Sequence, residues 1–401
     1  MMEVAYVTIE FPRPSETFVT REVRALKELG VDISVYTLRP PHADAEQMTK
    51  ERGIEDIPVY DRVFESIPFF LRWGVANPAT LVGFVSWIVQ KMLQDPVDLF
   101  KSLLLVPRAV AIFQKICDQR PDLVHLYWGH YPSIVGWLLK TYEPQLPITT
   151  FIGAYDLKKQ YGGTEEVLSA SKRVFTMAKI NEEPLKEWFG VSPGKVKVVY
   201  QSIDLEEIQK STEEVSEEPR RVASAGRLVR SKRMDDVLRV FASVHETFAS
   251  SRLVIMGDGP DRRRLEQLSI ELGVEEEVEF PGHVNERRVF EEMARADVFL
   301  FMSDKAGERL PNVVKEAMAC GCFCVSSQTP GMEELIDNGE DGYLVAPGDL
   351  EAATEIVSSY FEDRKGYEEV KDKAETKIER LFNLEEAVRG YRDEWETIAS
   401  E

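Results

Sequence analysis

The sequence contains few cysteines, and those it has do not suggest a disulfide framework. Four cysteines occur among 401 residues, and three of them, Cys320, Cys322 and Cys324, lie close together. Small secreted proteins are usually stabilised by several disulfide bonds, and four cysteines with three close together do not provide such a framework. We therefore expect a reducing, cytoplasmic environment. The alternation of these three residues fits the start of a buried strand better than a metal site, and we expect no bound metal or cofactor.

An excess of basic charge is also missing. The formal net charge is -21, which disfavours nonspecific binding to nucleic acid and simple docking on anionic lipid. The start, MMEVAYVTIEF, lacks the basic residues of a signal peptide. No apolar run reaches membrane-spanning length, because Arg72, Asn77 and Lys91 interrupt the most hydrophobic region. We therefore expect a cytoplasmic protein, at most peripheral at the inner face of the membrane.

Two nucleotide-binding signatures are absent. The loop after the first apolar segment has no G-x-G-x-x-G, and in LVIMGDGPDRRR, Arg262 stands where the third glycine of that fingerprint belongs. A dinucleotide-binding function is therefore poorly supported. The chain also contains no D-x-D triplet.

The apolar pattern predicts an α/β protein with parallel sheets. Val4 to Ile9 and Asp32 to Leu38 have the pattern of strands, and a helix from about Glu16 to Leu29, capped by Ser15 and ended by Gly30, lies between them. With 401 residues the chain is long enough for two domains. The acidic run Glu206 to Glu218 has no clear periodicity and predicts a polar linker.

Residues 61–110 are rich in Phe, Trp, Leu and Val without the alternation of a strand, and they predict helices. Their apolar character permits peripheral contact with a membrane. We favour packing on the sheet, since interfacial helices usually carry a cationic face and the stretch from Pro68 to Leu93 has only Arg72 and Lys91.

The stretch SDKAGERLPNVVKEAMACG contains two carboxylates, Glu308 and Glu316, with Pro311 and Asn312 between them. Proline suits a first helical turn, so Glu308 is expected in a loop and Glu316 inside a helix that ends at Gly321. The free amides and dipole of such a helix start can hold a phosphate, and the carboxylates can accept hydrogen bonds from sugar hydroxyls. A nucleotide sugar has that shape.

This stretch resembles the E-x7-E motif of family 4 glycosyltransferases, which have the GT-B fold of two facing Rossmann-like domains. The resemblance implies Glu308 as a catalytic residue, Arg227 and Lys232 as cations for the donor diphosphate, and Glu316 as a ligand of the ribose. Arg309 stands where the family usually has a small residue, and Arg233 stands where it usually has a glycine after the lysine. Further donor-binding positions implied by the resemblance are Gly226, Val284, Leu310, Pro311 and Asn312.

The first half, from FPRPSETFVTREVRALKELG onward, is similar to family 4 enzymes that build exopolysaccharide or lipopolysaccharide. By that resemblance Ser15, Glu16, Thr17 and Asp156 bind the acceptor. Relatives carry a histidine at the position of Gly153, beside the reacting sugar. Either His125 or His130 fills that space as a catalytic residue, or the donor diphosphate acts as base, or activity is lost.

The implied organisation is an acceptor-binding domain at 1–203, a donor-binding domain at 204–380, and a helix at 381–401 that returns to the first domain. The implied function is metal-independent, retaining transfer of a hexose from a nucleotide-diphosphate sugar to a carbohydrate or lipid-linked acceptor. A non-catalytic nucleotide-sugar-binding module and, less favoured, a nucleotide-sugar epimerase are the alternatives.

Overall fold

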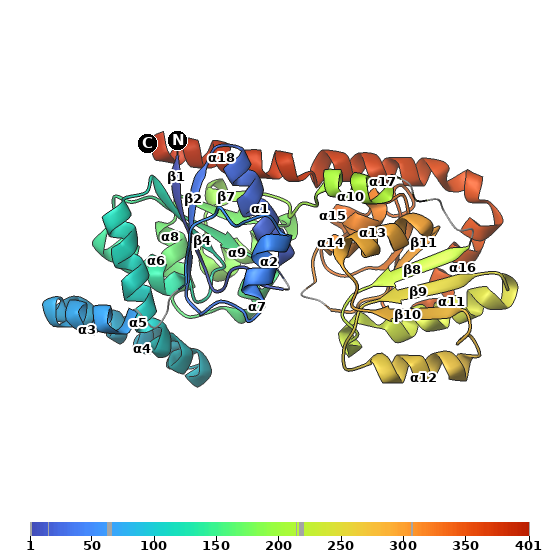
Figure 1. Cartoon of the computed structure of the whole chain (residues 1–401), viewed down its shortest axis with the longest axis horizontal. Coiled ribbons are helices and arrows are strands. Elements are labelled where there is room, and N and C mark those ends of the chain that lie inside the picture. Colours follow the sequence, from blue (N-terminus) through green and yellow to red (C-terminus); the bar gives the residue numbers. More distant parts are fainter. Residues whose placement is uncertain are drawn as a thin grey trace. The chain divides into compact units, whose positions relative to one another are not determined.

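The computed structural model describes residues 2–14, 16–61, 66–213, 215, 220–305 and 308–400 (Figure 1). The chain divides into two compact units, residues 1–200 with 385–401, and residues 201–384. The expected boundaries at 203 and 380 lie within a few residues of these.

Unit 1 is built on a seven-stranded sheet whose strand pairs are all parallel, in the order β3-β2-β1-β4-β5-β6-β7. The strands are β1 (Glu3–Thr8), β2 (Asp32–Thr37), β3 (Val59–Tyr60), β4 (Leu123–Tyr127), β5 (Ile148–Ile152), β6 (Arg173–Thr176) and β7 (Val196–Val198). The helices are α1 (Thr17–Glu28), α2 (Ala45–Glu51), α3 (Ser66–Ala76), α4 (Pro78–Met92), α5 (Pro96–Gln119), α6 (Ser133–Tyr142), α7 (Ala154–Lys159), α8 (Thr164–Ala170), α9 (Glu182–Phe189) and α18 (Leu384–Ser400).

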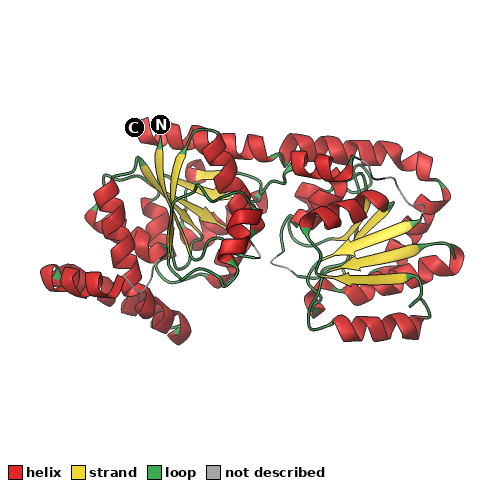
Figure 2. Ribbon diagram, viewed as in Figure 1, coloured by secondary structure: helices red, strands yellow, loops and turns green. Residues whose placement is uncertain are grey.

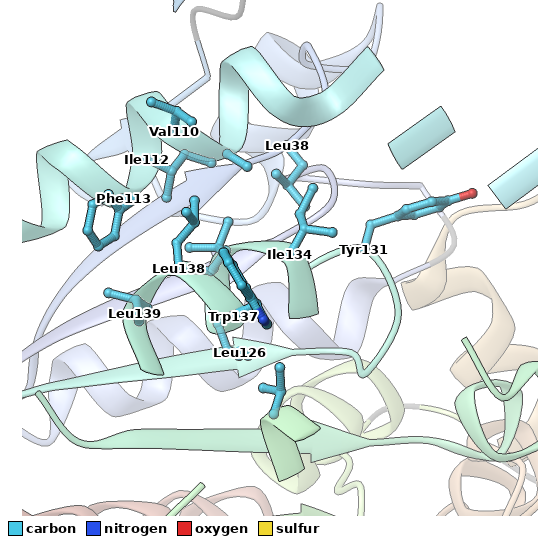
Figure 3. Packing of buried hydrophobic residues seen from close by; sticks show 14 of the residues in the cluster. Leu38, Val110, Ile112, Phe113, Leu126, Tyr131, Ile134, Trp137, Leu138 and Leu139 are labelled. Atoms are coloured by element: carbon cyan, nitrogen blue, oxygen red, sulfur yellow. The ribbon is translucent and has the colours of Figure 1, made fainter. Parts of the chain in front are cut away.

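Helices lie on both sides of the sheet (Figure 2). Figure 3 shows Val110 and Phe113 of α5 packed with Leu138 and Leu139 of α6 above Leu126 of β4. β4 and β5 are buried along their whole length and show no alternation of buried and exposed positions, as expected of central parallel strands, although they include the polar residues His125, Thr149 and Thr150. The candidate acceptor residues follow the carboxyl ends of two strands of this sheet, Glu16 and Thr17 after β1 and Asp156 after β5.

The last helix, α18, packs on unit 1. Tyr391 and Trp395 of α18 are buried, and Glu394 pairs with Arg173 of β6 at 2.8 Å and with Lys197 of β7 at 3.0 Å. The expected return of the C-terminal helix to the first domain is therefore seen in the structure.

Unit 2 has a six-stranded parallel sheet in the order β10-β9-β8-β11-β12-β13. The strands are β8 (Arg221–Ala225), β9 (Arg252–Met256), β10 (Val278–Gly282), β11 (Val298–Phe301), β12 (Phe323–Ser327) and β13 (Tyr343–Val345). The helices are α10 (Leu205–Thr212), α11 (Met234–Thr247), α12 (Arg262–Leu272), α13 (Glu286–Arg295), α14 (Asn312–Ala319), α15 (Met332–Leu335), α16 (Leu350–Glu362) and α17 (Glu368–Leu381).

One local prediction is wrong. The run from Glu206, expected to be a polar linker, begins within α10. The Asp204 carboxylate caps this helix by accepting a hydrogen bond from the Glu207 N–H at 3.0 Å, and Glu206 and Glu207 lie at the positive end of its dipole. Acidic residues that looked unstructured by periodicity are thus favourable in a first helical turn. Residues 214 and 216–219 lie outside the described part of the chain.

The predicted α/β class with two parallel sheets is confirmed. Within the described residues no helix is long and apolar enough to cross a membrane. The same part of the chain holds no group of three or more His, Cys, Asp or Glu side chains arranged to take a metal ion.

Candidate active-site residues

Two loops at the carboxyl ends of β8 and β11 bring Lys232 and Glu308 together in unit 2. The Lys232 ammonium donates to Glu308 Oε1, and the Ser303 hydroxyl donates to Glu308 Oε2 at 2.8 Å. Both ion-pair side chains are only 14% exposed, and the Lys232 Nζ lies 5.1 Å from the centroid of the Phe301 ring. The sequence placed these two residues in one site, and the structure brings them into direct contact.

The backbone holds the two loops against each other. The Ser231 carbonyl accepts from the Ser303 hydroxyl at 3.0 Å and from the Asp304 N–H at 3.2 Å. The Thr329 hydroxyl, which follows β12, donates to the Glu308 carbonyl at 3.3 Å. The loops after β8 and β11 therefore hold the carboxylate of Glu308, and the loop after β12 holds its backbone.

Arg227 lies in the same loop as Lys232 and is exposed. The loop passes so close to the turn after β9 that a Cβ on Gly257, whose φ is +132°, would lie 2.0 Å from the Gly226 carbonyl oxygen. The Leu228 N–H donates to the Asp258 carbonyl at 2.9 Å. The Gly-Asp-Gly sequence is therefore a backbone support for the cationic loop.

Arg233 occupies a left-handed conformation, with φ of +50°, at the position where the family usually has glycine. A non-glycine residue is strained there by about 1 kcal/mol. Its guanidinium makes two hydrogen bonds to the Asp236 carboxylate, both of 2.9 Å, which offset part of that strain. The departure from glycine is thus tolerated by a local partner.

The start of α14 follows Leu310, which is buried with a φ of +50°. Pro311 is the last residue before the helix and Asn312 is its first. The helix therefore begins one position later than expected. The Val314 and Lys315 N–H groups donate to the Pro311 carbonyl. This leaves the amides of Asn312 and Val313 at the helix start without a backbone acceptor among the described residues.

Glu316 lies within α14 and is half-buried, as predicted for its helical position. Arg309 is half-buried as well, and burial lowers the pKa of its guanidinium while the charge of Glu334 opposes that shift. The Nε and Nη1 atoms of Arg309 find no hydrogen-bond partner in the described part of the chain. Val284 lies apart from these residues, in a surface hollow of about 420 Å³ after β10 with Arg287 and Arg288.

Sequence reasoning missed Lys315. This residue of α14 is fully buried, and its ammonium donates to the Gln201 carbonyl at 2.5 Å and to the Asn312 side-chain oxygen at 3.1 Å. It also lies 4.9 Å from the centroid of the Phe382 ring. The signal available was a lysine on the apolar side of a predicted helix, adjacent to Glu316.

In unit 1 the side chain of Trp128 occupies the space beside Gly153. A Cβ on Gly153 would lie 2.5 Å from Cζ3 of the indole, although the φ of Gly153, -97°, is one that any residue adopts. Trp128 itself has a φ of +85°, an unusual conformation for an aromatic residue. The absence of the family's histidine at position 153 is therefore matched by a tryptophan at 128.

His130 and Asp156 form a buried pair next to this tryptophan. The His130 Nδ1 and the Asp156 Oδ1 are 2.6 Å apart, and Asp156 Oδ2 accepts from the Gly153 N–H at 3.0 Å. The carboxylate both orients the imidazole and caps α7.

His125 is not placed for contact with a sugar, and the expectation that it is catalytic needs correction. It is fully buried in β4 among the rings of Tyr6, Phe175 and Trp395, and burial lowers its pKa to about 3. Its Nδ1 is 2.9 Å from the Thr149 hydroxyl. Tyr391 and Trp395 of α18 cover the face of β4 that carries His125, so His125 is a core residue.

Of the expected acceptor residues at the start of α1, Ser15 lies outside the described residues. Glu16 precedes the helix, pairs with Arg13 at 2.6 Å and accepts a hydrogen bond from the Trp128 side chain. Burial raises the pKa of Glu16 in spite of these two partners. Thr17 begins α1 and is half-buried. Glu16 therefore belongs to the same cluster as Trp128 and His130.

Comparison with known proteins agrees with this architecture. Residues 206–377 match the family described as "Glycosyl transferases group 1". The chain is 24% identical over 420 residues to the amylovoran biosynthesis glycosyltransferase AmsK of Erwinia amylovora, covering 99% of this chain and 100% of that one.

A second relative is N-acetylgalactosamine-N,N'-diacetylbacillosaminyl-diphospho-undecaprenol 4-alpha-N-acetylgalactosaminyltransferase of Campylobacter jejuni. It is 32% identical over 202 residues, which span 50% of this chain and 53% of that protein, so the match covers about half of each. The structure of Anabaena Alr3699/HepE in complex with UDP and glucose superposes with a TM-score of 0.69 at 15% identity, covering 99% of this chain and 100% of that one.

The fold is that of the GT-B class. Residues 206–377 resemble the group 1 glycosyl transferases, and the relatives named above are glycosyltransferases. These similarities agree with the resemblance to family 4 glycosyltransferases seen in the motifs.

Proposed function

We propose that the protein is a retaining glycosyltransferase that moves a hexose from a nucleotide-diphosphate sugar to a carbohydrate or lipid-linked acceptor in cell-surface glycan synthesis. The observation that carries this proposal is the cluster of Lys232, Glu308 and Ser303 beside the start of α14. The amylovoran enzyme and the Campylobacter transferase, whose names state such activities, support it.

Each residue has a role that its chemistry suits. Negative charge gathers on the leaving diphosphate as the glycosidic bond breaks, and Arg227, Lys232 and the amides at the start of α14 supply fixed positive charge for it. This set needs no metal ion to balance the diphosphate. Glu308, held by Ser303, accepts hydrogen bonds from sugar hydroxyls, and Glu316 from the ribose.

Replacing Glu308 by Gln tests the catalytic assignment. The substitution keeps the shape but removes the charge that pairs with Lys232, so sugar transfer should be lost while the circular dichroism spectrum and the melting temperature stay close to those of the wild type. Turnover at the wild-type rate would remove Glu308 from the reaction.

Replacing Arg227 by Ala tests the donor site by calorimetry. A thermal-shift screen of UDP-, GDP- and ADP-sugars first identifies the donor. The affinity of Arg227→Ala for that donor should be about tenfold or more below that of the wild type, because charge-assisted hydrogen bonds contribute about 1.5–3 kcal/mol. Arg239→Ala, at another exposed position of unit 2, is the control. Equal affinity in both variants would contradict the role of Arg227.

Peripheral membrane contact through residues 61–110 forms part of this proposal, since a lipid-linked acceptor lies at a bilayer. The described part of that segment exposes large apolar side chains, among them Leu71, Val75 and Phe100, which are 61%, 84% and 63% exposed. Residues 66–119 carry five Lys or Arg against three Asp and no Glu, in a chain of net charge -21. α3 and α4 pack mainly on α5 and on each other, not on the sheet as expected, and their outer faces remain apolar (Figure 1).

Co-sedimentation with vesicles of phosphatidylglycerol tests that contact. Leu71→Glu and Phe100→Glu together should abolish it, because each places a charge where apolar surface meets lipid. Ile270→Glu, at a 55% exposed position of α12, should leave binding unchanged. Binding that survives the double substitution would refute the contact.

The alternatives are a non-catalytic nucleotide-sugar-binding module and an epimerase of the same fold. The contact between Lys232 and Glu308 favours an enzyme, because a module has no need of a buried carboxylate next to the diphosphate cation. Tight donor binding without transfer or hydrolysis would favour the module, and an altered free donor sugar in the absence of acceptor would favour the epimerase.

A further inference from the structure

The Trp128 region combines three features that packing alone does not explain. Trp128 is half-buried rather than buried, unlike Trp395 in the core of the same unit, and its φ of +85° is strained. Strain of this kind costs on the order of 1–3 kcal/mol and persists where the surrounding structure enforces it. The backbone next to it is tightly packed, because a Cβ on Gly129 would lie 2.3 Å from Cδ1 of Ile152.

Aromatic rings surround this tryptophan. The centroid of Phe18 lies 6.4 Å from that of Trp128, and that of His130 lies 6.3 Å away. Tyr155 lies 5.5 Å from His130 and is 59% exposed. A tyrosine and a tryptophan left partly open to solvent at the carboxyl ends of adjacent parallel strands are typical of a ligand site.

The polar groups of the cluster are acceptors for hydroxyl groups. Glu16 lies within hydrogen-bonding reach of the Trp128 side chain, and Asp156 is paired with His130. Carboxylates beside aromatic rings suit a sugar, whose hydroxyls donate to carboxylates and whose C–H groups pack on the electron-rich ring faces. The two carboxylates disfavour a phosphate, and the cations for that group lie in unit 2.

We propose that Trp128, with Phe18 beside it and Tyr155 on the far side of His130, forms the aromatic wall of a carbohydrate subsite that binds one pyranose ring of the acceptor. The inference rests on the proposed function, since it names the part of the acceptor that unit 1 holds. Gly153 then contributes to the same subsite, because only a residue without a Cβ leaves room for the Trp128 indole.

Saturation-transfer NMR on the full chain without nucleotide tests the subsite. The probes are the methyl glycosides of glucose, galactose, mannose, N-acetylglucosamine and rhamnose. At least one should receive saturation from the wild-type protein, and its affinity should fall about tenfold in Trp128→Ala and less in Trp128→Phe. Trp188→Ala removes a 49% exposed tryptophan from α9 and should change nothing.

Gly153→Ala gives a second, independent readout. The new methyl group displaces the indole, so binding should weaken in the wild-type background and stay unchanged in the Trp128→Ala background. Affinities in Trp128→Ala equal to those of the wild type, no transfer to any probe, or equal effects of Gly153→Ala in both backgrounds would each overturn the proposal. Donor affinity measured in parallel on the same variants reports on the proposed function separately.

Discussion

Lys315 offers a prediction whose size follows from its surroundings. The side chain is fully buried, and burial lowers its pKa from an ordinary 10.5 to about 7, while the charge of Glu316 acts in the opposite direction. The Gln201 carbonyl, the Asn312 side chain and the Phe382 ring favour the ammonium form. Lys315→Met keeps the apolar part of the side chain and removes the titrating group.

The sign follows from proton counting. Between pH 7 and 10.5 the unfolded chain carries a proton on this amine that the folded protein lacks. Unfolding therefore takes up a proton, and raising the pH favours the folded state. A pKa lowered from 10.5 to about 7 corresponds to about 5 kcal/mol at most, of which about 4 kcal/mol falls below pH 10. Relaxation of the protein around the charged amine reduces this, so we expect a change of about 2–4 kcal/mol.

Urea unfolding of wild type and Lys315→Met at several pH values from about 6 to about 10 measures the effect. The free energy of unfolding of the variant minus that of the wild type should fall by that amount as the pH rises. The variant also loses the hydrogen bond to Gln201, which changes the difference between the two free energies by a constant and leaves its dependence on pH unaffected. Lys365→Met, at an exposed position, should run parallel to the wild type. Parallel curves for Lys315→Met as well would refute the reasoning.

Three further predictions concern stability and are measured by urea unfolding. Gly257→Ala should lower the free energy of unfolding by about 3 kcal/mol, because of the positive φ of Gly257 and its contact with Gly226. Gly273→Ala, with φ of +69° and open space around it, should lower it by about 1 kcal/mol. Equal losses in the two variants would contradict the close approach at Gly257. Arg233→Gly should be about 1 kcal/mol more stable than Arg233→Ala, since both lose the Asp236 pair and only glycine relieves the strain; the reverse order would argue against strain. Burial raises the pKa of Glu22 to about 8, so wild-type stability should fall as the pH rises from about 4.5 to about 8, and Glu22→Gln should remove that slope; a slope unchanged in the variant would assign it to another group.

Much of the fold could be predicted because its signals are local. The strand–helix–strand opening, the buried central strands and the position of Glu308 before a helix all follow from apolar pattern and turn residues within a short window. Arg227 and Lys232, by contrast, were singled out by the resemblance to family 4 glycosyltransferases. The first turn of α10 was missed because its stability comes from a cap and a dipole, which periodicity does not register.

The role of His125 could not be predicted, because it depends on residues far along the chain. A lone histidine is usually a core or surface residue, but ligands collect at the carboxyl ends of parallel strands, where His125 and His130 were expected. Tyr391 and Trp395, more than 260 positions later, cover it and make it a core residue. Only tertiary structure joins these segments, so a local reading assigns the wrong environment.

Departures from a family pattern have the same limitation when each is read alone. Gly153 in isolation suggests a lost catalytic histidine, yet the indole of Trp128 fills the space that a side chain would occupy. Arg233 in isolation suggests a distorted cation loop, yet Asp236 compensates it from within α11. In both cases the second residue lies within hydrogen-bonding or packing distance of the first. A missing motif residue is therefore evidence of lost function only when no neighbouring side chain compensates for it, and here Trp128 fills the space beside Gly153 and Asp236 pairs with Arg233.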